Sequence, residues 1–232
     1  MSKSLLITID GPAGSGKSTA AKYLAERLGF IYLDTGAMYR GVTYAALKNN
    51  VADDKDSVID LVKKIDIRLD FVKGTTRVFL DDEEVTEQIR TPEVSAMVSE
   101  ISRIGEVREE LVKKQREIGA QGGMVAEGRD TTTVVFPDAD IKIYLTASLE
   151  SRVDRRYKEF IANGQNISRE EVKANIEKRD VIDSGRSISP LKKADDAIEI
   201  DNTSTPIDKE IENILKIIEE KGTEKQSHLK SQ

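Results

Sequence analysis

The sequence predicts an α/β fold in which a five-stranded parallel sheet is flanked by helices. Two observations lead to this prediction. Short apolar runs of strand length alternate along the chain with longer segments of helical period, as is typical of parallel strands joined by crossover helices. The apolar runs are also largely continuous, as expected for strands that are covered on both faces. A chain of 232 residues is long enough for one such domain with a small insert.

Strands are expected where an apolar run is short and ends at glycine or at polar residues. The five runs are Leu5–Asp10, Phe30–Leu33, Met124–Glu127, Ile141–Leu145 and Ala197–Ile200. Helices are expected where apolar residues recur about every 3.6 residues, and the first of them stops at Gly29. The helical segments are Lys17–Leu28, Gly36–Lys48, Ile104–Ile118, Leu149–Ala162, Ser168–Ile182 and Ile207–Lys221.

One stretch departs from this rhythm. Apolar and polar residues alternate over residues 67–71, Val78 and Leu80 continue the two-residue spacing, and Lys73-Gly74-Thr75 between them predicts a turn. This is the pattern of a β-hairpin. We therefore expect an insert of hairpin plus helix at residues 60–100, within a core of residues 1–59 and 101–221. The polar tail, residues 222–232, is expected to be disordered.

The composition argues against several classes of protein. The net charge of −6, from 36 Lys+Arg and 42 Asp+Glu, predicts no polynucleotide partner and no anionic membrane partner. The chain has no cysteine, and its single histidine, His228, lies in the polar tail, which argues against thiolate metal sites and a Ser-His-Asp triad. The apolar stretch Leu5–Ile9 is too short for a signal peptide or a membrane span, so a cytoplasmic location is expected.

A glycine-rich loop follows the first expected strand. Residues 11–18 match the pattern G-x-x-x-x-G-K-[ST] and open a helix, the context in which backbone N–H groups cradle phosphates. The nucleotide-binding candidates are Gly11, Pro12, Ala13, Gly14, Ser15, Gly16, Lys17, Ser18 and Thr19. Lys17 is expected to reach the β- and γ-phosphates, and the Ser18 hydroxyl to ligate Mg²⁺.

This loop occurs in GTPases, ATPase motors and kinases alike. A GTPase would need an N-K-x-D element for guanine and a D-x-x-G switch, and neither occurs in a suitable place. A motor ATPase usually has an acidic pair at the end of an apolar strand, whereas this strand continues into Glu127-Gly128-Arg129-Asp130. Arginine at the carboxyl end of a strand suits the phosphate of an acceptor, because ligands of open α/β sheets bind there.

Several dispersed motifs occur in one order along the chain. They are Ile9-Asp10-Gly11-Pro12, Asp34-Thr35-Gly36-Ala37-Met38-Tyr39-Arg40, Ile89-Arg90-Thr91, Val107-Arg108-Glu109, Glu127-Gly128-Arg129-Asp130, Thr133-Val134-Val135-Phe136-Pro137, Arg179-Asp180, Asp183, Arg186 and Ser189-Pro190-Leu191. With them the chain resembles the bacterial cytidylate kinases along nearly its whole length. Thr35 replaces a commoner serine, and Glu127 stands where relatives often have aspartate.

The resemblance implies a P-loop kinase core, an inserted monophosphate-binding region and a helical lid around residues 149–165. It implies phosphorylation of CMP, and of dCMP, by ATP with Mg²⁺ and without a covalent intermediate. We expect a monomer whose partners are these nucleotides. Two alternatives stay open at this stage: a kinase for another acceptor, such as AMP, UMP or a metabolite alcohol, and a P-loop switch protein that hydrolyses ATP slowly.

The resemblance also implies roles for single residues in binding the acceptor. Thr35 is expected to cap the helix that carries Tyr39 and Arg40, with Arg40 on the acceptor phosphate. Ser99, Arg108 and Asp130 are expected to bind cytosine, whose amino donor needs a carboxylate and whose acceptors need donors. An ordinary helix serine remains an alternative for Ser99.

Six further arginines and one aspartate complete the expected site. Arg129 is implied to contact the acceptor phosphate, and Arg179 and Asp183 the ribose, with Arg186 on the neighbouring phosphate. A surface ion pair between Arg179 and Asp183, which share one helix face, is the alternative. Arginines of the lid are implied to act on the transferring phosphoryl group, unless they only form a solvated helix face. They are Arg152, Arg155 and Arg156.

Overall fold

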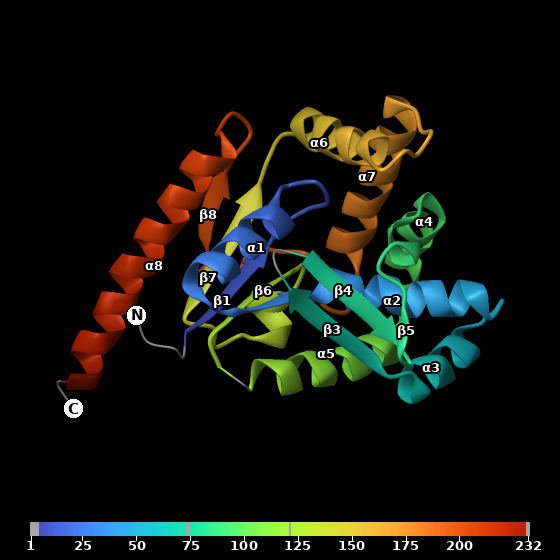
Figure 1. Ribbon diagram of the computed structural model, residues 1–232, viewed down its shortest axis with the longest axis horizontal. Coiled ribbons are helices and arrows are strands. Elements are labelled where there is room, and N and C mark those ends of the chain that lie inside the picture. The colour runs from blue at the N-terminus through green and yellow to red at the C-terminus, as the bar shows by residue number, and fades with distance from the viewer. Residues whose placement is uncertain (1–4, 73–74, 121, 231–232) are drawn as a thin grey trace.

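A computed structural model describes residues 5–72, 75–120 and 122–230. Its main sheet is five-stranded and wholly parallel, in the order β2-β6-β1-β7-β8 (Figure 1). The strands are β1 (Leu6–Asp10), β2 (Ile31–Asp34), β6 (Met124–Gly128), β7 (Ile141–Thr146) and β8 (Ile198–Asp201). All five predicted strands are present, and the predicted parallel α/β fold is confirmed.

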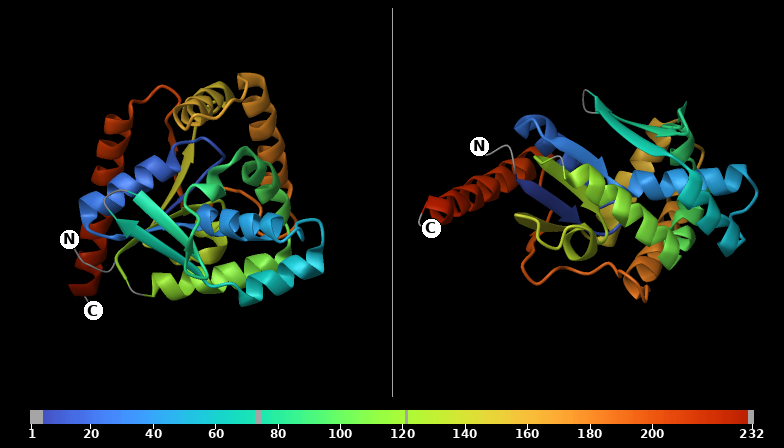
Figure 2. Two further views of the ribbon diagram at one scale, coloured as in Figure 1. Left: turned by 45° about the vertical axis from the view of Figure 1, so that its right-hand side comes forward. Right: turned by 90° about the horizontal axis from the view of Figure 1, so that it is seen from below.

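Helices cover both faces of this sheet, and the sheet separates two apolar cores. The helices outside the insert are α1 (Lys17–Leu28), α2 (Thr35–Lys48), α5 (Gly105–Gly119), α6 (Leu149–Ala162), α7 (Arg169–Gly185) and α8 (Ile207–Lys230), of which α6 and α7 pack on each other in a third, smaller cluster. Successive β6 residues face opposite cores: Val125 packs in the core with α1 and α8, and Ala126 in the core with α2 and α5. Figure 2 shows α8 lying beside α1.

The insert forms a second, antiparallel sheet outside the main one (Figure 1). It consists of α3 (Lys55–Lys64), β3 (Ile67–Val72), β4 (Thr75–Leu80), β5 (Glu83–Glu84), the 3₁₀ turn η1 (Gln88–Arg90) and α4 (Pro92–Ile101). The predicted hairpin and helix are present, and α3 and β5 are additional. Residues 73 and 74 of the predicted turn lie outside the described residues. Phe71 of β3 packs on Tyr32 of β2 with ring centroids 5.0 Å apart, which joins the insert to the core.

Where the sequence led us to expect a disordered tail, the structure continues α8 to Lys230. Good helix formers such as Glu224, Lys225 and Gln226 and the absence of proline favour that continuation. None of the helices in the described ranges combines the length and the apolar character that a membrane span requires.

Candidate active site

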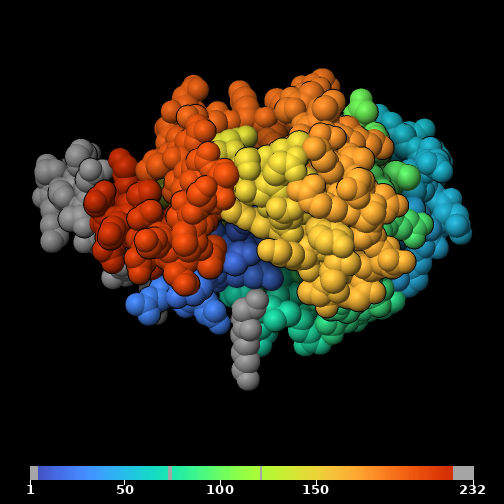
Figure 3. All heavy atoms as spheres, turned by 90° about the horizontal axis from the view of Figure 1, so that it is seen from above, coloured from blue at the N-terminus to red at the C-terminus, as the bar shows by residue number. Residues whose placement is uncertain are grey.

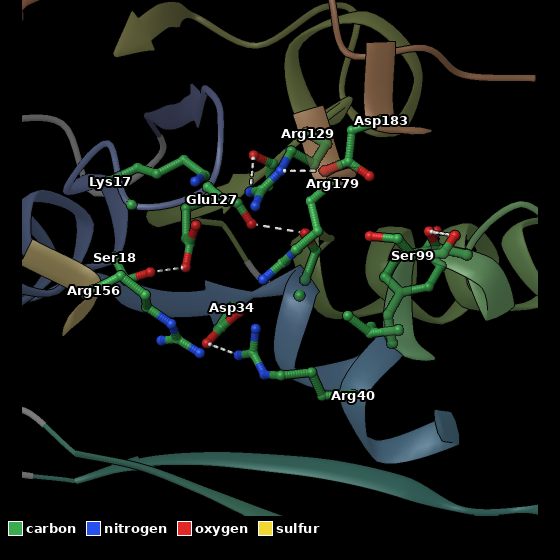
Figure 4. A pocket seen from close by; sticks show the side chains of 18 of the residues that line it. Lys17, Ser18, Asp34, Arg40, Ser99, Glu127, Arg129, Arg156, Arg179 and Asp183 are labelled. Atoms are coloured by element: carbon green, nitrogen blue, oxygen red, sulfur yellow. Dashed lines mark hydrogen bonds and ion pairs between the residues drawn. The ribbon is translucent and has the colours of Figure 1, made fainter. Parts of the chain in front are cut away.

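A cavity of about 450 Å³ lies where the carboxyl ends of β1, β2 and β6 face the insert and the helices α6 and α7. Most of its lining is charged or polar, and arginine is the commonest residue type (Figure 4). The arginines of the lining are Arg40, Arg90, Arg108, Arg129, Arg155, Arg156, Arg179 and Arg186. Such a concentration of buried positive charge suits ligands that carry several phosphates.

The glycine-rich loop forms one end of the cavity. Gly14 and Gly16 have φ angles of 74° and 93°, the left-handed region that favours glycine. Lys17 begins α1 and donates from Nζ to the Pro12 carbonyl at 2.9 Å. Burial, and then the charge of Arg129, lower the pKa of Lys17 to about 7. The charges of Glu127 and Asp10 favour the ammonium form but do not outweigh burial and the neighbouring arginines.

Not every residue of that loop faces the cavity. Ala13, Gly14, Gly16, Lys17, Ser18 and Thr19 line it. Gly11, Pro12 and Ser15 do not line it. Gly11 lies against β7 so closely that an added Cβ would be 2.0 Å from the Leu145 carbonyl oxygen, so this position requires glycine.

Ser18 and Glu127 form an oxygen-rich pair beside the loop. The Ser18 hydroxyl donates to Glu127 Oε1 at 2.6 Å, and the Tyr32 hydroxyl donates to the same oxygen at 3.2 Å. Burial, and then the charge of Asp34, raise the pKa of Glu127. A hydroxyl and a carboxylate suit Mg²⁺, which uses few protein ligands and takes others from phosphate and water. The described residues contain no cluster of three metal-ligating side chains, so phosphate would have to complete the site.

The start of α2 differs from the prediction. Asp34, not Thr35, caps this helix, because its carboxylate accepts from the Ala37 N–H at 2.8 Å. The Thr35 hydroxyl instead donates to the Glu127 carbonyl at 2.7 Å. Asp34 also accepts from Arg40 at 2.9 Å. Burial raises the pKa of Asp34, but Arg40 and the Ala37 amide outweigh it and leave this pKa below its usual value.

The expected cytosine-binding residues converge at the other end of the cavity. Arg108 and Asp130 form a buried ion pair, and Arg108 also donates to the Ser102 carbonyl at 3.1 Å. The Arg108 guanidinium lies 5.2 Å from the centroid of the Tyr39 ring. Ser99 lines the cavity here, and its backbone carbonyl accepts a hydrogen bond from the Ser102 hydroxyl at 2.9 Å. The guanidinium donors of Arg108 and the carboxylate acceptor of Asp130 are therefore held together, although these residues are 22 positions apart in the chain.

A buried carboxylate supports the segment that carries Arg129 and Asp130. Asp10, at the end of β1, accepts from the backbone N–H groups of Thr131 and Thr132 at 3.0 and 2.7 Å. Both threonine hydroxyls donate to it at 2.6 Å. These four bonds anchor the turn after β6 to the strand that precedes the phosphate loop.

Arg129 and α7 contribute a second cluster. Arg129 Nε donates to Asp183 at 3.0 Å and Arg186 lies 3.9 Å from the same carboxylate, so Asp183 forms ion pairs with Arg129 and Arg186 and not with Arg179. Burial, and then Arg129, lower the pKa of Arg179 to about 9. Buried nitrogens of Arg40, Arg179 and Arg186 have no hydrogen-bond partner among the described residues. Unpartnered buried guanidinium nitrogens are costly in a protein and indicate where an anionic ligand binds. As predicted, α7 ends before Arg186.

The three lid arginines separate into two groups. Arg155 and Arg156 line the cavity, and Arg156 contacts Ser95 of the insert at 3.3 Å. Arg152 does not line it. Its guanidinium pairs with Asp180 at 2.7 Å and donates to the carbonyls of Ala13 and Ala147, each at 3.2 Å. The helical spacing predicted all three on one face, but the Arg152 guanidinium contacts the Ala13 carbonyl of the phosphate loop instead of lining the cavity.

Sequence reasoning missed several residues of the lining. Arg90 lies in the quoted motif Ile89-Arg90-Thr91, which was the available signal. Lys22 follows Ser18 by one helical turn on α1, so the helix pattern also placed it near the loop. No local pattern pointed to the others, which come from separate elements. The polar ones are Ser102, Glu159 and Asn175, whereas Asp34 opens the quoted motif Asp34-Thr35-Gly36 and was given no role.

The chain is similar to known proteins along nearly its whole length. The model of the cytidylate kinase family matches residues 7–220. The cytidylate kinase of Bacillus subtilis (strain 168) is 48% identical over 223 residues, which cover 96% of this chain and all of that protein. That of Carboxydothermus hydrogenoformans is 48% identical over 217 residues, 93% of this chain and 98% of that protein.

Among solved structures, an uncharacterised protein from Eubacterium ventriosum ATCC 27560 has a TM-score of 0.51 at 14% identity. The alignment covers 94% of this chain and 99% of that protein, and this likeness concerns the fold alone. The match to the family model and the identity to curated relatives, each over nearly the whole chain, lead to one conclusion: the chain belongs to the cytidylate kinase family.

Proposed function

We propose that this protein transfers the γ-phosphoryl group of ATP to CMP, and to dCMP, by direct in-line displacement. One observation carries the proposal. The phosphate loop and a cluster of buried, incompletely paired arginines face each other across a single cavity. Two phosphorylated nucleotides, one bound at each end of the cavity, would give anionic partners to the loop N–H groups and to the incompletely paired arginines. Their phosphates would meet between Lys17 and Arg129.

At the donor end, the loop N–H groups and Lys17 bind the phosphates of ATP. Lys17 would exchange its bond to the Pro12 carbonyl for the β- and γ-phosphates. Ser18 would ligate Mg²⁺, with Glu127 oriented by Tyr32 to bind its water. Mg²⁺, when bound, neutralises charge on the phosphates that flank the bond that breaks.

At the acceptor end, Asp130 accepts a hydrogen bond from the cytosine amino group, and Arg108 and Ser99 donate to its ring acceptors. Base binding then requires only that existing polar groups exchange partners, because Arg108 and Asp130 already lie together. Arg40, Arg129 and Arg186 bind the acceptor phosphate, and Asp183 with Arg179 binds the ribose. This phosphate needs no general base, because its oxygen is ionised at neutral pH.

The lid supplies charge and excludes water. Arg156 touches Ser95 of α4 in the insert, so it links the two parts of the protein that flank the cavity. Arg155 and Arg156 are placed to stabilise negative charge on the transferring phosphoryl group. Closure around both nucleotides would exclude the water that otherwise hydrolyses ATP. Arg152 is proposed to hold the lid helix α6 against the phosphate loop through Ala13, rather than to contact the phosphates.

The test is a coupled assay of ADP production, run with every ribo- and deoxyribonucleoside monophosphate. We expect CMP and dCMP to raise ADP production far above the rate with ATP alone. Preference for AMP, UMP or another acceptor would contradict the proposed substrate. A slow ATPase rate that no monophosphate changes would contradict kinase activity and favour a switch protein.

We also propose that the protein acts as a monomer in the cytoplasm. Residues of a single chain line both ends of the cavity, so catalysis requires no second copy. Sedimentation at assay concentration should give the mass of one chain, 25.8 kDa. A stable dimer would contradict the proposal.

A further inference from the structure

A buried hydrogen-bond network connects the phosphate loop, the lid and the C-terminal helix. Its centre is Asn202, the residue that follows β8, which is 1% exposed. The Asn202 amide group donates to the Ser15 carbonyl at 2.8 Å and to Glu210 of α8 at 2.7 Å. Arg155 donates to the Asn202 side-chain oxygen at 2.9 Å and to its carbonyl at 2.8 Å. In Figure 3 the blue, yellow and orange-red parts of the chain meet on one face.

The partners of Asn202 determine how its amide is oriented. The Ser15 carbonyl and the Glu210 carboxylate accept hydrogen bonds, so the NH₂ end of the amide must face them. Arginine has only donors, so the oxygen end must face Arg155. A carboxylate or an apolar side chain of similar size at position 202 could not make both sets of bonds.

The network also determines where the Arg155 guanidinium lies. Arg155 Nη1 donates to the Ser15 carbonyl at 3.3 Å, and the group lines the cavity beside Gly16. A Cβ on Gly16 would be 3.3 Å from the Asn202 amide nitrogen and 3.6 Å from Arg155, so the two side chains pack against the loop. Three of the five guanidinium N–H donors bond to described residues, which leaves two for a phosphate.

We infer that Asn202 is a positioning residue for Arg155. It holds the guanidinium beside the phosphate loop, so that the arginine meets the transferring phosphoryl group without first having to be ordered. Glu210 in turn holds the Asn202 amide in the orientation that binds Arg155. The inference rests on the proposed function, since it assigns Arg155 to phosphoryl transfer.

A double-mutant cycle tests this inference. Asn202→Ala should lower kcat by about 10–100-fold, the size of loss that a misplaced catalytic group produces, and should change the KM for CMP much less. If Asn202 acts through Arg155, the double variant Asn202→Ala/Arg155→Ala should have a kcat within about twofold of Arg155→Ala alone. A multiplicative loss in the double variant, or an unchanged kcat in Asn202→Ala, would overturn the inference.

Glu210 provides a second route that leaves Asn202 in place if Asn202→Ala does not fold. Glu210→Ala removes an acceptor from the amide and should lower kcat less than Asn202→Ala, again only when Arg155 is present. Glu210→Gln retains an acceptor oxygen and should restore kcat. A loss in Glu210→Ala that persists at full size without Arg155 counts against the inference.

The matched control is Thr203→Val, in the same loop. The Thr203 hydroxyl accepts from the Ser148 N–H at 2.8 Å and so also joins this loop to the lid, but it does not contact Arg155. Its kcat should stay within about twofold of the unaltered protein. A loss equal to that of Asn202→Ala would mean that any loosening of the loop has the same effect, which overturns the assignment. The cycle uses the best acceptor found in the coupled assay, so a wrong acceptor is recognised separately from a wrong role for Asn202.

Discussion

Asp183 pairs with Arg129 at 3.0 Å, although Arg179 lies one helical turn away from it on α7. The pair joins α7 to the turn after β6, 54 residues earlier in the chain. Burial raises the pKa of Asp183, but Arg129, Arg179 and Arg186 together hold it below its usual value. Asp183 therefore stays ionised and can accept hydrogen bonds from a ribose.

Asp183→Ala should lower kcat/KM for CMP more than for dCMP. The 2′-hydroxyl is the only difference between these substrates, and a carboxylate that accepts from it discriminates between them. The measurement is kcat/KM for both substrates at saturating ATP and Mg²⁺. Equal losses would show that Asp183 does not bind the 2′-hydroxyl, although it could still orient Arg129.

Lys17 should take up a proton when ATP binds. In the free protein its pKa is about 7, against 10.5 for an ordinary lysine, so the amine is mostly neutral at pH 8. Phosphate oxygens favour the ammonium form and raise this pKa, so binding at pH 8 should draw in nearly one proton for each site. Calorimetric titration in buffers of different ionisation enthalpy measures that uptake. Lys17→Gln should abolish it and Lys48→Gln, at an exposed site, should not; equal uptake in both would contradict the assignment.

The lowered pKa of Lys17 also predicts how the stability of the protein depends on pH. A lysine whose pKa is lower in the folded state binds fewer protons there, so its contribution makes the free protein more stable as pH rises from about 7 toward 10.5. Lys17→Met should remove this rise. The comparison is the free energy of unfolding of both proteins at pH 7 and pH 9, without nucleotide. Identical pH dependence in the two proteins would contradict the lowered pKa.

Asp130 should determine the choice of base. Its carboxylate accepts from the cytosine amino group but repels the O4 oxygen of uracil, whereas an asparagine amide can donate to O4. Asp130→Asn should therefore lower kcat/KM for CMP and raise the UMP-to-CMP ratio about 5- to 150-fold. A ligand-free melting curve is the control, because the variant leaves Arg108 without its buried counter-ion. An unchanged ratio in a folded variant would show that Asp130 does not read the base.

Glu127→Gln should raise the Mg²⁺ concentration needed for half-maximal activity by about 10- to 100-fold, the usual effect of losing a group that orients metal ligands. The matched control is Tyr32→Phe, which removes one donor to Glu127 but keeps the carboxylate, and its Mg²⁺ requirement should change less. Equal Mg²⁺ dependence in Glu127→Gln and the unaltered protein would contradict a role at the metal.

Arg152→Ala should mainly lower the stability of the protein, whereas Arg156→Ala should mainly lower kcat. Arg152 is bonded to Ala13, Ala147 and Asp180, so its loss should lower the free energy of unfolding by about 2–3 kcal/mol. Arg156 lines the cavity, so its loss should lower kcat about 10²- to 10³-fold and leave the KM for CMP and the stability nearly unchanged. Chemical denaturation and steady-state kinetics on both variants separate the two effects. A KM effect alone in Arg156→Ala would contradict its place in the lid.

The sequence by itself determined the framework of this protein. The bounds of α1, Lys17–Leu28, agree with the prediction at both ends, because glycine flanks the helix on both sides and its apolar residues keep a regular period. The five strands were predictable for a similar reason, since burial on both faces leaves short apolar runs. The phosphate loop followed from local spacing alone.

Only the tertiary structure decided which charged groups meet. Helical spacing put Arg152, Arg155 and Arg156 on one face and Arg179 beside Asp183, but long side chains can reach partners on other elements. Arg152 reached the carbonyl of Ala13 in the phosphate loop, and Asp183 reached Arg129 on the turn after β6. Periodicity specifies which face of an element a side chain occupies. The choice between competing partners depends on how elements far apart in the chain pack together, and a local pattern does not contain that information.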